Sequence, residues 1–147
     1  MTDHKFTRML VGWYGFLQAI HLIVLLIARF KYVKTGAVGF PAPGPPGGWS
    51  PQTNYFLLGL GYLDFCTAII ALLFIYRFFT KKHRYRTLGL VVLSSSTVSA
   101  IIFGLGTFPS GAWNYHPITY FAMLVLYLPV IILFFVFIKN KVPDRIK

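Results

Sequence analysis

The chain has 147 residues, of which 56% are hydrophobic and only 12% are charged. Soluble domains are usually nearer to roughly 45–50% apolar and about 25% charged, so this composition excludes a soluble globular domain and indicates an integral membrane protein. A net charge of +11 would suggest nucleic-acid binding in a soluble protein. Here the basic residues flank apolar segments instead, so we expect no nucleic-acid partner.

Four apolar segments reach the length of about 20 residues that is needed to cross a hydrocarbon core about 30 Å thick. They cover approximately residues 9–29, 54–79, 87–107 and 117–138. The first follows basic residues, as a cleavable signal would, but it ends without a small-residue cleavage site, so we interpret it as a retained helix. The sequence predicts a single all-α, four-helix transmembrane domain over residues 1–147, built as two hairpins.

The connection between the first two helices, at about residues 30–53, is rich in proline and glycine. Five of each lie between Gly36 and Pro51, a composition that favours an extended strap over helix or strand. Aromatic residues beside this loop and the other outer turn suit an interfacial belt. These residues are Trp49, Tyr55, Trp113, Tyr115 and Tyr120.

The basic residues predict the orientation, because Lys and Arg accumulate in short cytoplasmic segments. Most of the 14 lie near the N-terminus, in the second connection (77–86) and after residue 138. The first connection holds Arg29, Lys31 and Lys34, and the third holds none. Both termini are therefore expected to face the cytoplasm, or the matching inner compartment of an organelle. A cell membrane and a mitochondrial inner membrane both fit.

The predicted helices contribute polar residues to one layer at mid-depth. Asp64 interrupts the apolar stretch "YFLLGLGYLDFCTAIIALLFIY", and the rise per residue places polar groups of the other helices at a similar depth. The layer consists of Gln18, His21, Asp64, Ser94, Thr97 and Tyr127, with Ser95 and Ser99 as further hydroxyls. Polar groups in hydrocarbon turn inward and find partners, so we expect these side chains to meet inside the bundle.

Asp64 is the central residue of this layer, and His21 or Gln18 is its expected partner. Two protonation states are expected for Asp64: either it is ionised and paired with protonated His21, or its carboxyl group is protonated and neutral. An ionisable residue inside the membrane is a functional candidate, here a proton or substrate site. It could equally act as a polar contact that orients helices or docks a neighbouring subunit, and both interpretations stay open.

Cofactor chemistry has little support in the sequence. The single cysteine, Cys66, excludes an intramolecular disulfide and fits a small packing residue. His21, His116 and Cys66 are weak candidates for metal ligands. The two histidines are expected at different depths in the membrane, which disfavours a haem bound by both. Haem and copper therefore stay minor alternatives, and we predict no cofactor. No phosphate-binding loop, hydrolase elbow or HExxH motif occurs.

Three hypotheses for function follow from these features. The first is a small accessory subunit of a larger membrane complex, because the chain has little extramembrane substance and 18% aromatic residues. The second is a small proton-coupled transporter or hydrophobic-ligand-binding protein that uses Asp64 and acts alone or by self-association. The third is a membrane enzyme that acts on a lipid or quinone through Asp64 and His21. The expected partners are lipid and other membrane subunits.

Overall fold

The structure is a computed structural model that describes residues 4–38, 42–80 and 85–139. It is all helical, with long helices α1 (His4–Thr35), α2 (Pro51–Phe79), α3 (Tyr85–Thr107) and α5 (Pro117–Lys139). Two short pieces, η1 (Phe108–Ser110) and α4 (Ala112–Tyr115), form the turn between α3 and α5. The four long helices are long and apolar enough to cross a membrane, which confirms the predicted all-helical fold with four helices of spanning length.

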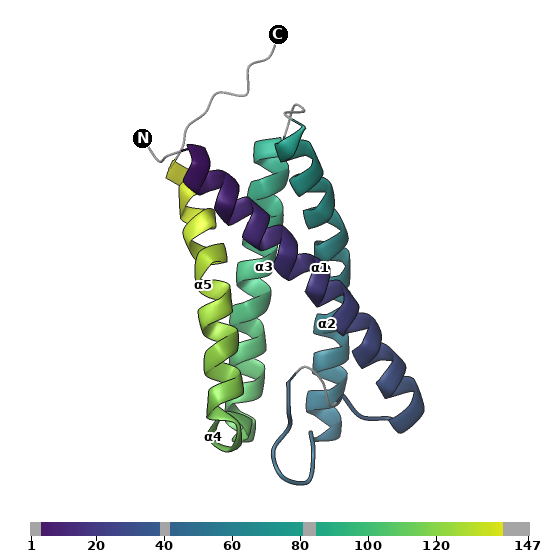
Figure 1. Ribbon diagram of the computed structural model, residues 1–147. Coiled ribbons are helices and arrows are strands. Elements are labelled where there is room, and N and C mark those ends of the chain that lie inside the picture. Colours follow the sequence, from purple (N-terminus) through teal and green to yellow (C-terminus); the bar gives the residue numbers. More distant parts are fainter. Residues whose placement is uncertain (1–3, 39–41, 81–84, 140–147) are drawn as a thin grey trace.

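The long helices form an up-and-down bundle (Figure 1). Helix α3 lies beside α2 and α5, and α1 crosses the bundle diagonally while packing against α2 and α5. The beginning of α1 and the end of α5 lie at the same end of the bundle, and the strap 36–50 lies at the other. This arrangement fits an even number of spans, whereas the side of the membrane on which each end lies stays a prediction.

Helix α1 is longer at both ends than the predicted 9–29 span. Its 32 residues correspond to about 48 Å at 1.5 Å per residue, more than the roughly 30 Å of a bilayer core. The sequence-based boundary ended at Arg29 because basic residues were assigned to the loop, yet Lys and Arg are good helix formers. The helix instead ends before Gly36, whose φ of 70° suits a C-terminal glycine and whose N–H donates to the Tyr32 carbonyl.

Helices α2 and α5 show how local signals set the other boundaries. Pro51 occupies the first turn of α2, and the Ser50 hydroxyl oxygen accepts a hydrogen bond from the Thr53 N–H at 3.2 Å, so α2 starts three residues before the predicted boundary. Helix α5 runs without interruption through Pro129. Trp13 of α1 donates to the Leu126 carbonyl, about one turn before this proline.

Two apolar clusters lie at opposite ends of the bundle, with the polar residues between them. One joins Leu10, Val11 and Tyr14 of α1 to residues 71–74 of α2, 92–93 of α3 and 130–137 of α5. The other joins the strap to Leu57, Ala112 and Tyr120. In α2 and α3 the polar residues Asp64 and Ser94–Ser99 fall between the positions that supply these clusters, whereas α1 supplies only the first cluster.

Only the first half of α1 is buried by the other helices. Leu10, Val11, Tyr14 and Gln18 are buried, but no described residue of α1 after Gln18 is. The second half leans away from the bundle (Figure 1). This divergence leaves room between α1 and α2 on the side that the strap covers.

The described parts of the strap, residues 36–38 and 42–50, contain neither helix nor strand. Side chains that follow the α3–α5 turn bind residues 43 and 44 of the strap. His116 Nε2 donates to the Gly44 carbonyl at 3.1 Å, and the Tyr120 hydroxyl donates to the Pro43 carbonyl at 2.9 Å. Residues 39–41 lie outside the described part.

The aromatic belt is present only in part. Tyr55 and Tyr115 are exposed as expected, but Trp49 is only 8% and Tyr120 only 1% exposed. Tyr120 stacks on Trp113 with ring centroids 4.7 Å apart. Trp113 and Tyr120 therefore pack beneath the strap, and Trp49, which belongs to the strap, packs into the same apolar cluster.

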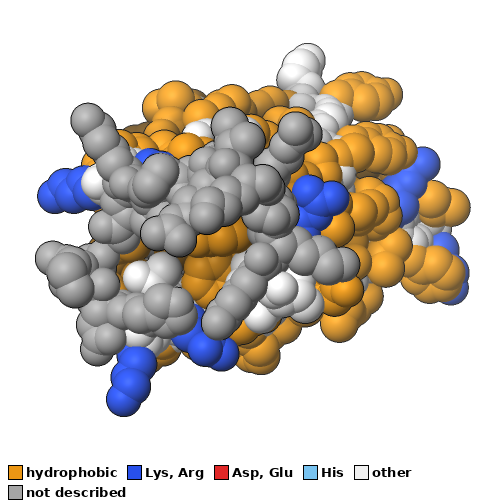
Figure 2. Space-filling model, turned by 90° about the horizontal axis from the view of Figure 1, so that it is seen from above, with side chains coloured by type: hydrophobic (Ala, Val, Ile, Leu, Met, Phe, Trp, Pro, Cys, Tyr) orange, Lys and Arg blue, Asp and Glu red, His pale blue; other side chains and the backbone are white. Residues whose placement is uncertain are grey.

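The flanks of the bundle are hydrophobic. Figure 2 looks onto the end where α1 begins and α5 ends, and it shows apolar side chains around the sides with Lys and Arg side chains among them at the edge. Apolar helix faces of this kind indicate a lipid environment.

Candidate functional site

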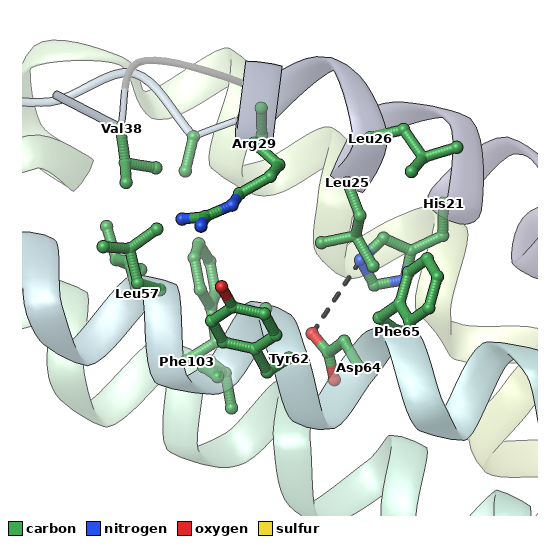
Figure 3. A pocket seen from close by; sticks show the side chains of 15 residues that line it. His21, Leu25, Leu26, Arg29, Val38, Leu57, Tyr62, Asp64, Phe65 and Phe103 are labelled. Atoms are coloured by element: carbon green, nitrogen blue, oxygen red, sulfur yellow. Dashed lines mark ion pairs between the residues drawn. The ribbon is translucent and has the colours of Figure 1, made fainter. Parts of the chain in front are cut away.

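A cavity of about 340 Å³ lies between the second half of α1, the first half of α2 and the strap. Its walls are mostly aliphatic or aromatic, and Leu25, Leu57 and Phe65 are typical of them (Figure 3). The charged or ionisable residues that line it are His21, Arg29 and Asp64. This volume lies within the range of small-ligand sites, and a mostly apolar wall with few polar groups is typical of them.

His21 and Asp64 meet at one end of the cavity. His21 Nε2 lies 3.8 Å from Asp64 Oδ2, and the exposed fractions of the two side chains are 28% and 18%. The Ser99 hydroxyl of α3 donates to the other carboxylate oxygen, Oδ1. Three helices therefore hold the carboxyl group, and the pairing of Asp64 with His21 agrees with the sequence-based expectation.

The sequence of α2 explains why Asp64 faces this cavity. Leu57, Gly61 and Asp64 are spaced by four and three residues, so they lie on one face, and all three line the cavity. The face continues towards Ala68 and Ala71, which are fully buried against the other helices. Asp64 thus lies where the buried face of α2 meets the cavity.

The pair is electrically neutral in two protonation states. A protonated His21 with an ionised Asp64 has no net charge, and so does a neutral histidine with a protonated acid. In either state the pair offers both a hydrogen-bond donor and an acceptor to a group in the cavity. Asp64 is the one acidic residue within the described ranges, because Asp3 and Asp144 lie outside them.

Arg29 lies at the other end of the cavity. Its guanidinium carbon is 5.5 Å from the centre of the Tyr62 ring and 5.8 Å from that of Tyr32. Figure 3 shows the side chain reaching from α1 towards α2 over Tyr62. Stacking on aromatic rings orients a guanidinium but leaves its N–H donors available.

A second polar group lies beside the cavity, deeper between α1, α3 and α5. The Tyr14 hydroxyl is 2.8 Å from Ser96 Oγ, and Gln18 is 2% exposed. Tyr127 of α5 lies within hydrogen-bonding reach of Ser96 and Gln18. Gln18 and Tyr127 therefore belong to a contact that joins helices, and they do not contact Asp64 through a hydrogen bond in the described structure.

The two hydroxyl residues singled out on α3 do not reach Asp64. Thr97 donates back to the Leu93 carbonyl of its own helix at 2.8 Å, as mid-helix threonines often do. Ser94 makes no side-chain hydrogen bond with any described residue. The hydroxyls that cross between helices are Ser95, bonded to Thr67 at 2.8 Å, together with Ser96 and Ser99.

The weak metal candidates are dispersed. His116 is bonded to the strap, and Cys66 is exposed on α2, so the expectation that Cys66 is a packing residue was wrong. Within residues 4–38, 42–80 and 85–139, no three His, Cys, Asp or Glu side chains come together in a way that could hold a metal ion.

Sequence reasoning missed Tyr14, Ser96 and Arg29. Tyr14, Gln18 and His21 follow one another at intervals of four and three residues, so a polar stripe on one helix face was a usable signal for Tyr14. Which of several adjacent serines faces a neighbour depends on the rotation of α3, for which the run "SSST" gives no indication. Arg29 was assigned to topology because it lies among other basic residues.

No family model matches this chain, and no curated protein or solved structure matches it either.

Proposed function

We propose that the protein binds a hydrophobic ligand from the bilayer in the cavity between α1 and α2, with the Asp64–His21 pair contacting a polar group of that ligand. The observation that carries the proposal is the combination of a mostly apolar cavity of about 340 Å³ with an ionisable pair in its wall. A fully apolar cavity would favour no particular orientation of a ligand. A polar pair at one end selects a hydroxyl, amine or carbonyl group there.

The chemistry of the pair supports ligand binding or proton exchange more strongly than catalysis. Burial of a polar group without a partner is costly, so a ligand that hydrogen-bonds the pair is favoured over one that only fills the cavity. Transport coupled to protonation of Asp64 would use the same contact. An enzymatic reaction on a lipid or quinone would need His21 and Asp64 to face the same cavity, which they do. The further hydroxyl that bonds Asp64, that of Ser99, is only 2% exposed and does not line the cavity.

Gly61 offers a sharp test, because it lines the cavity and has a matched control two residues earlier. A Cβ at Gly61 would meet only Leu25, at 3.7 Å, which is ordinary contact, and a Cβ at the exposed Gly59 would meet nothing. Gly61→Leu should fill part of the cavity while Gly59→Leu makes the same change of helix propensity outside it. We expect Gly61→Leu to lower ligand binding by about tenfold or more, and Gly59→Leu to leave it unchanged.

The measurement uses the purified protein in phosphatidylcholine nanodiscs and a photoreactive long-chain fatty alcohol, which is neutral and carries one hydroxyl. Peptide mass spectrometry locates the labelled residues and empty nanodiscs correct for partition into lipid. Labels on residues 21–29 and 57–65 that disappear in Gly61→Leu support the proposal. Asp64→Asn keeps the shape of the cavity but changes the polar pair, and it should also weaken labelling. Labels spread evenly over the outer faces of the helices, equally in both glycine variants, would refute a cavity site.

The accessory-subunit hypothesis stays a prediction. Exposed apolar residues cover all four long helices, and lipid or a partner protein would cover them equally well. It predicts a particle larger than this chain after extraction in mild detergent, with stoichiometric partners.

A further inference from the structure

Arg29 is the one charged group of the cavity that the described residues do not neutralise. Its guanidinium contacts the faces of Tyr32 and Tyr62 and makes no hydrogen bond or ion pair with a described residue. The sole described carboxylate, that of Asp64, is paired with His21 and bonded by Ser99. Among the described residues, therefore, none occupies the N–H donors of Arg29 at the cavity.

The position of Arg29 along α1 suits the head group of a membrane ligand. It lies eight residues after His21, or about 12 Å along the helix axis. His21 is near the middle of α1 (His4–Thr35), so Arg29 lies nearer than His21 to the strap end of α1 and to the edge of a hydrocarbon core about 30 Å thick. The cavity thus runs from the polar pair, past the apolar residues Leu25 and Leu57, to a cation nearer to the membrane surface.

We propose that the ligand is an anionic amphiphile whose carboxylate or phosphate head group binds Arg29, while a neutral hydrogen-bonding group about 12 Å away contacts Asp64 and His21. This inference rests on the proposed function and specifies its ligand class. Arginine presents a planar set of donors that matches both carboxylate and phosphate, so charge complementarity favours an anion at this end of the cavity. A cationic amphiphile would be repelled by the same group.

Lys34 provides a matched control for Arg29. It carries the same charge near the same end of α1, but its Nζ lies 4.4 Å from the centre of the Phe30 ring and it does not line the cavity. General attraction of anions to this end of the protein should respond to Arg29→Gln and Lys34→Gln alike. A specific head-group site should respond to Arg29→Gln alone.

The experiment measures equilibrium binding of three probes that share an ω-hydroxyalkyl chain of medium length. One ends in a carboxylate, one in the corresponding methyl ester and one in a phosphate. The wild-type protein, Arg29→Gln and Lys34→Gln are compared in phosphatidylcholine nanodiscs, with empty nanodiscs subtracted. We expect an anionic probe to bind the wild type about tenfold more tightly than the ester, the size of effect of one charge-assisted hydrogen bond. Arg29→Gln should abolish this preference, and Lys34→Gln should retain it.

The outcomes separate this inference from the proposed function. A carboxylate preference identifies a fatty-acid type of ligand, and a phosphate preference identifies a phospholipid type; either supports the inference. Equal binding of ester and anions by the wild type, or an anion preference that survives Arg29→Gln, overturns it while cavity binding stands. Failure of all three probes and of the neutral fatty alcohol to bind in the cavity overturns both proposals. Circular dichroism of Arg29→Gln checks that its helix content is unchanged.

Discussion

Tyr14 shows how a single hydroxyl joins helices in this protein. Its ring packs fully buried in the apolar cluster near the start of α1, and its hydroxyl reaches Ser96 across the bundle. Hydrogen bonds between helices in a membrane contribute about 0.6 kcal/mol on average and up to about 1.7 kcal/mol. One such contact is therefore modest in energy, and it links side chains of α1 and α3 that the packing of the bundle brings together.

A double-mutant cycle tests this contact. Tyr14→Phe and Ser96→Ala should each lower the free energy of unfolding by about 0.5–1.5 kcal/mol, because each leaves the other hydroxyl with fewer partners. The double variant should cost less than the sum of the two, with a coupling near 0.5–1 kcal/mol. Tyr55→Phe is the control, since the Tyr55 side chain is 70% exposed. Strict additivity of the two changes would show that the hydroxyls do not interact in the membrane.

Residue by residue, the sequence indicates which groups are polar at mid-depth but not how all of them pair. His21 was among the expected partners of Asp64 because both fall near the middle of their helices. The division into an Asp64–His21–Ser99 set and a Tyr14–Ser96 set depends on the rotation of each helix about its axis. Rotation is set by packing across the bundle, and α5 in particular is apolar on all sides, so its own sequence gives no buried face.

At the scale of helices, the two glycines of the "GLG" triplet at residues 104–106 differ in their packing. A Cβ on Gly106 would lie 2.3 Å from Cε1 of Phe56, whereas one on Gly104 would meet nothing within 4 Å. Gly106 therefore allows the close contact between α3 and α2 at the strap end. Gly104 has no such role, because the space at its Cβ position is open.

Gly106→Ala should be destabilising relative to Gly104→Ala. The added methyl group must displace the Phe56 ring, and overpacking of this kind typically costs about 1–3 kcal/mol. Both variants gain the same helix propensity, so the difference between their unfolding free energies isolates the steric effect. Adding Phe56→Leu to Gly106→Ala should recover part of the loss. Equal stabilities of the two alanine variants would mean that Phe56 does not pack on Gly106.

The existence of the four long helices was predictable, because a run of about 20 apolar residues in a membrane protein has few possible structures other than a helix. Helix length was less predictable. The charges at Arg29, Lys31 and Lys34 look like the end of a span, but the helix continues because the first residue with a positive φ, Gly36, comes later. The strap was recognised by composition, while the burial of Trp49 and Tyr120 beneath it required the fold.

At the scale of the whole molecule, the distribution of basic residues carries a topology prediction. Arg8, Arg77 and Arg86 lie at the end of the bundle where α1 and α3 begin, and no basic residue occurs in the described part of the strap. The lysine and arginine residues of 81–84 and 140–147 lie outside the described ranges. The positive-inside tendency then predicts that the strap lies outside and that both ends of the chain face the cytoplasm or the matching inner compartment of an organelle.

Cysteine labelling tests this orientation in a Cys66→Ser background. Gln52, in the first turn of α2, and Thr80, after its last turn, are both exposed and lie at opposite ends of that helix. A membrane-impermeant maleimide should label Gln52→Cys in intact cells and Thr80→Cys only after permeabilisation. The reverse pattern would place the strap inside, and labelling of both in intact cells would show that α2 does not span the membrane.

Cys66 is an attachment site for a spectroscopic probe in the unmodified chain. It is the single cysteine of the sequence, it is exposed, and it lies two residues from Asp64 on α2. A nitroxide attached there requires no engineered residue, and its collision rates with dissolved oxygen and with a water-soluble nickel chelate depend on immersion depth. The native thiol therefore allows the depth of the Asp64 level to be read directly against the bilayer centre.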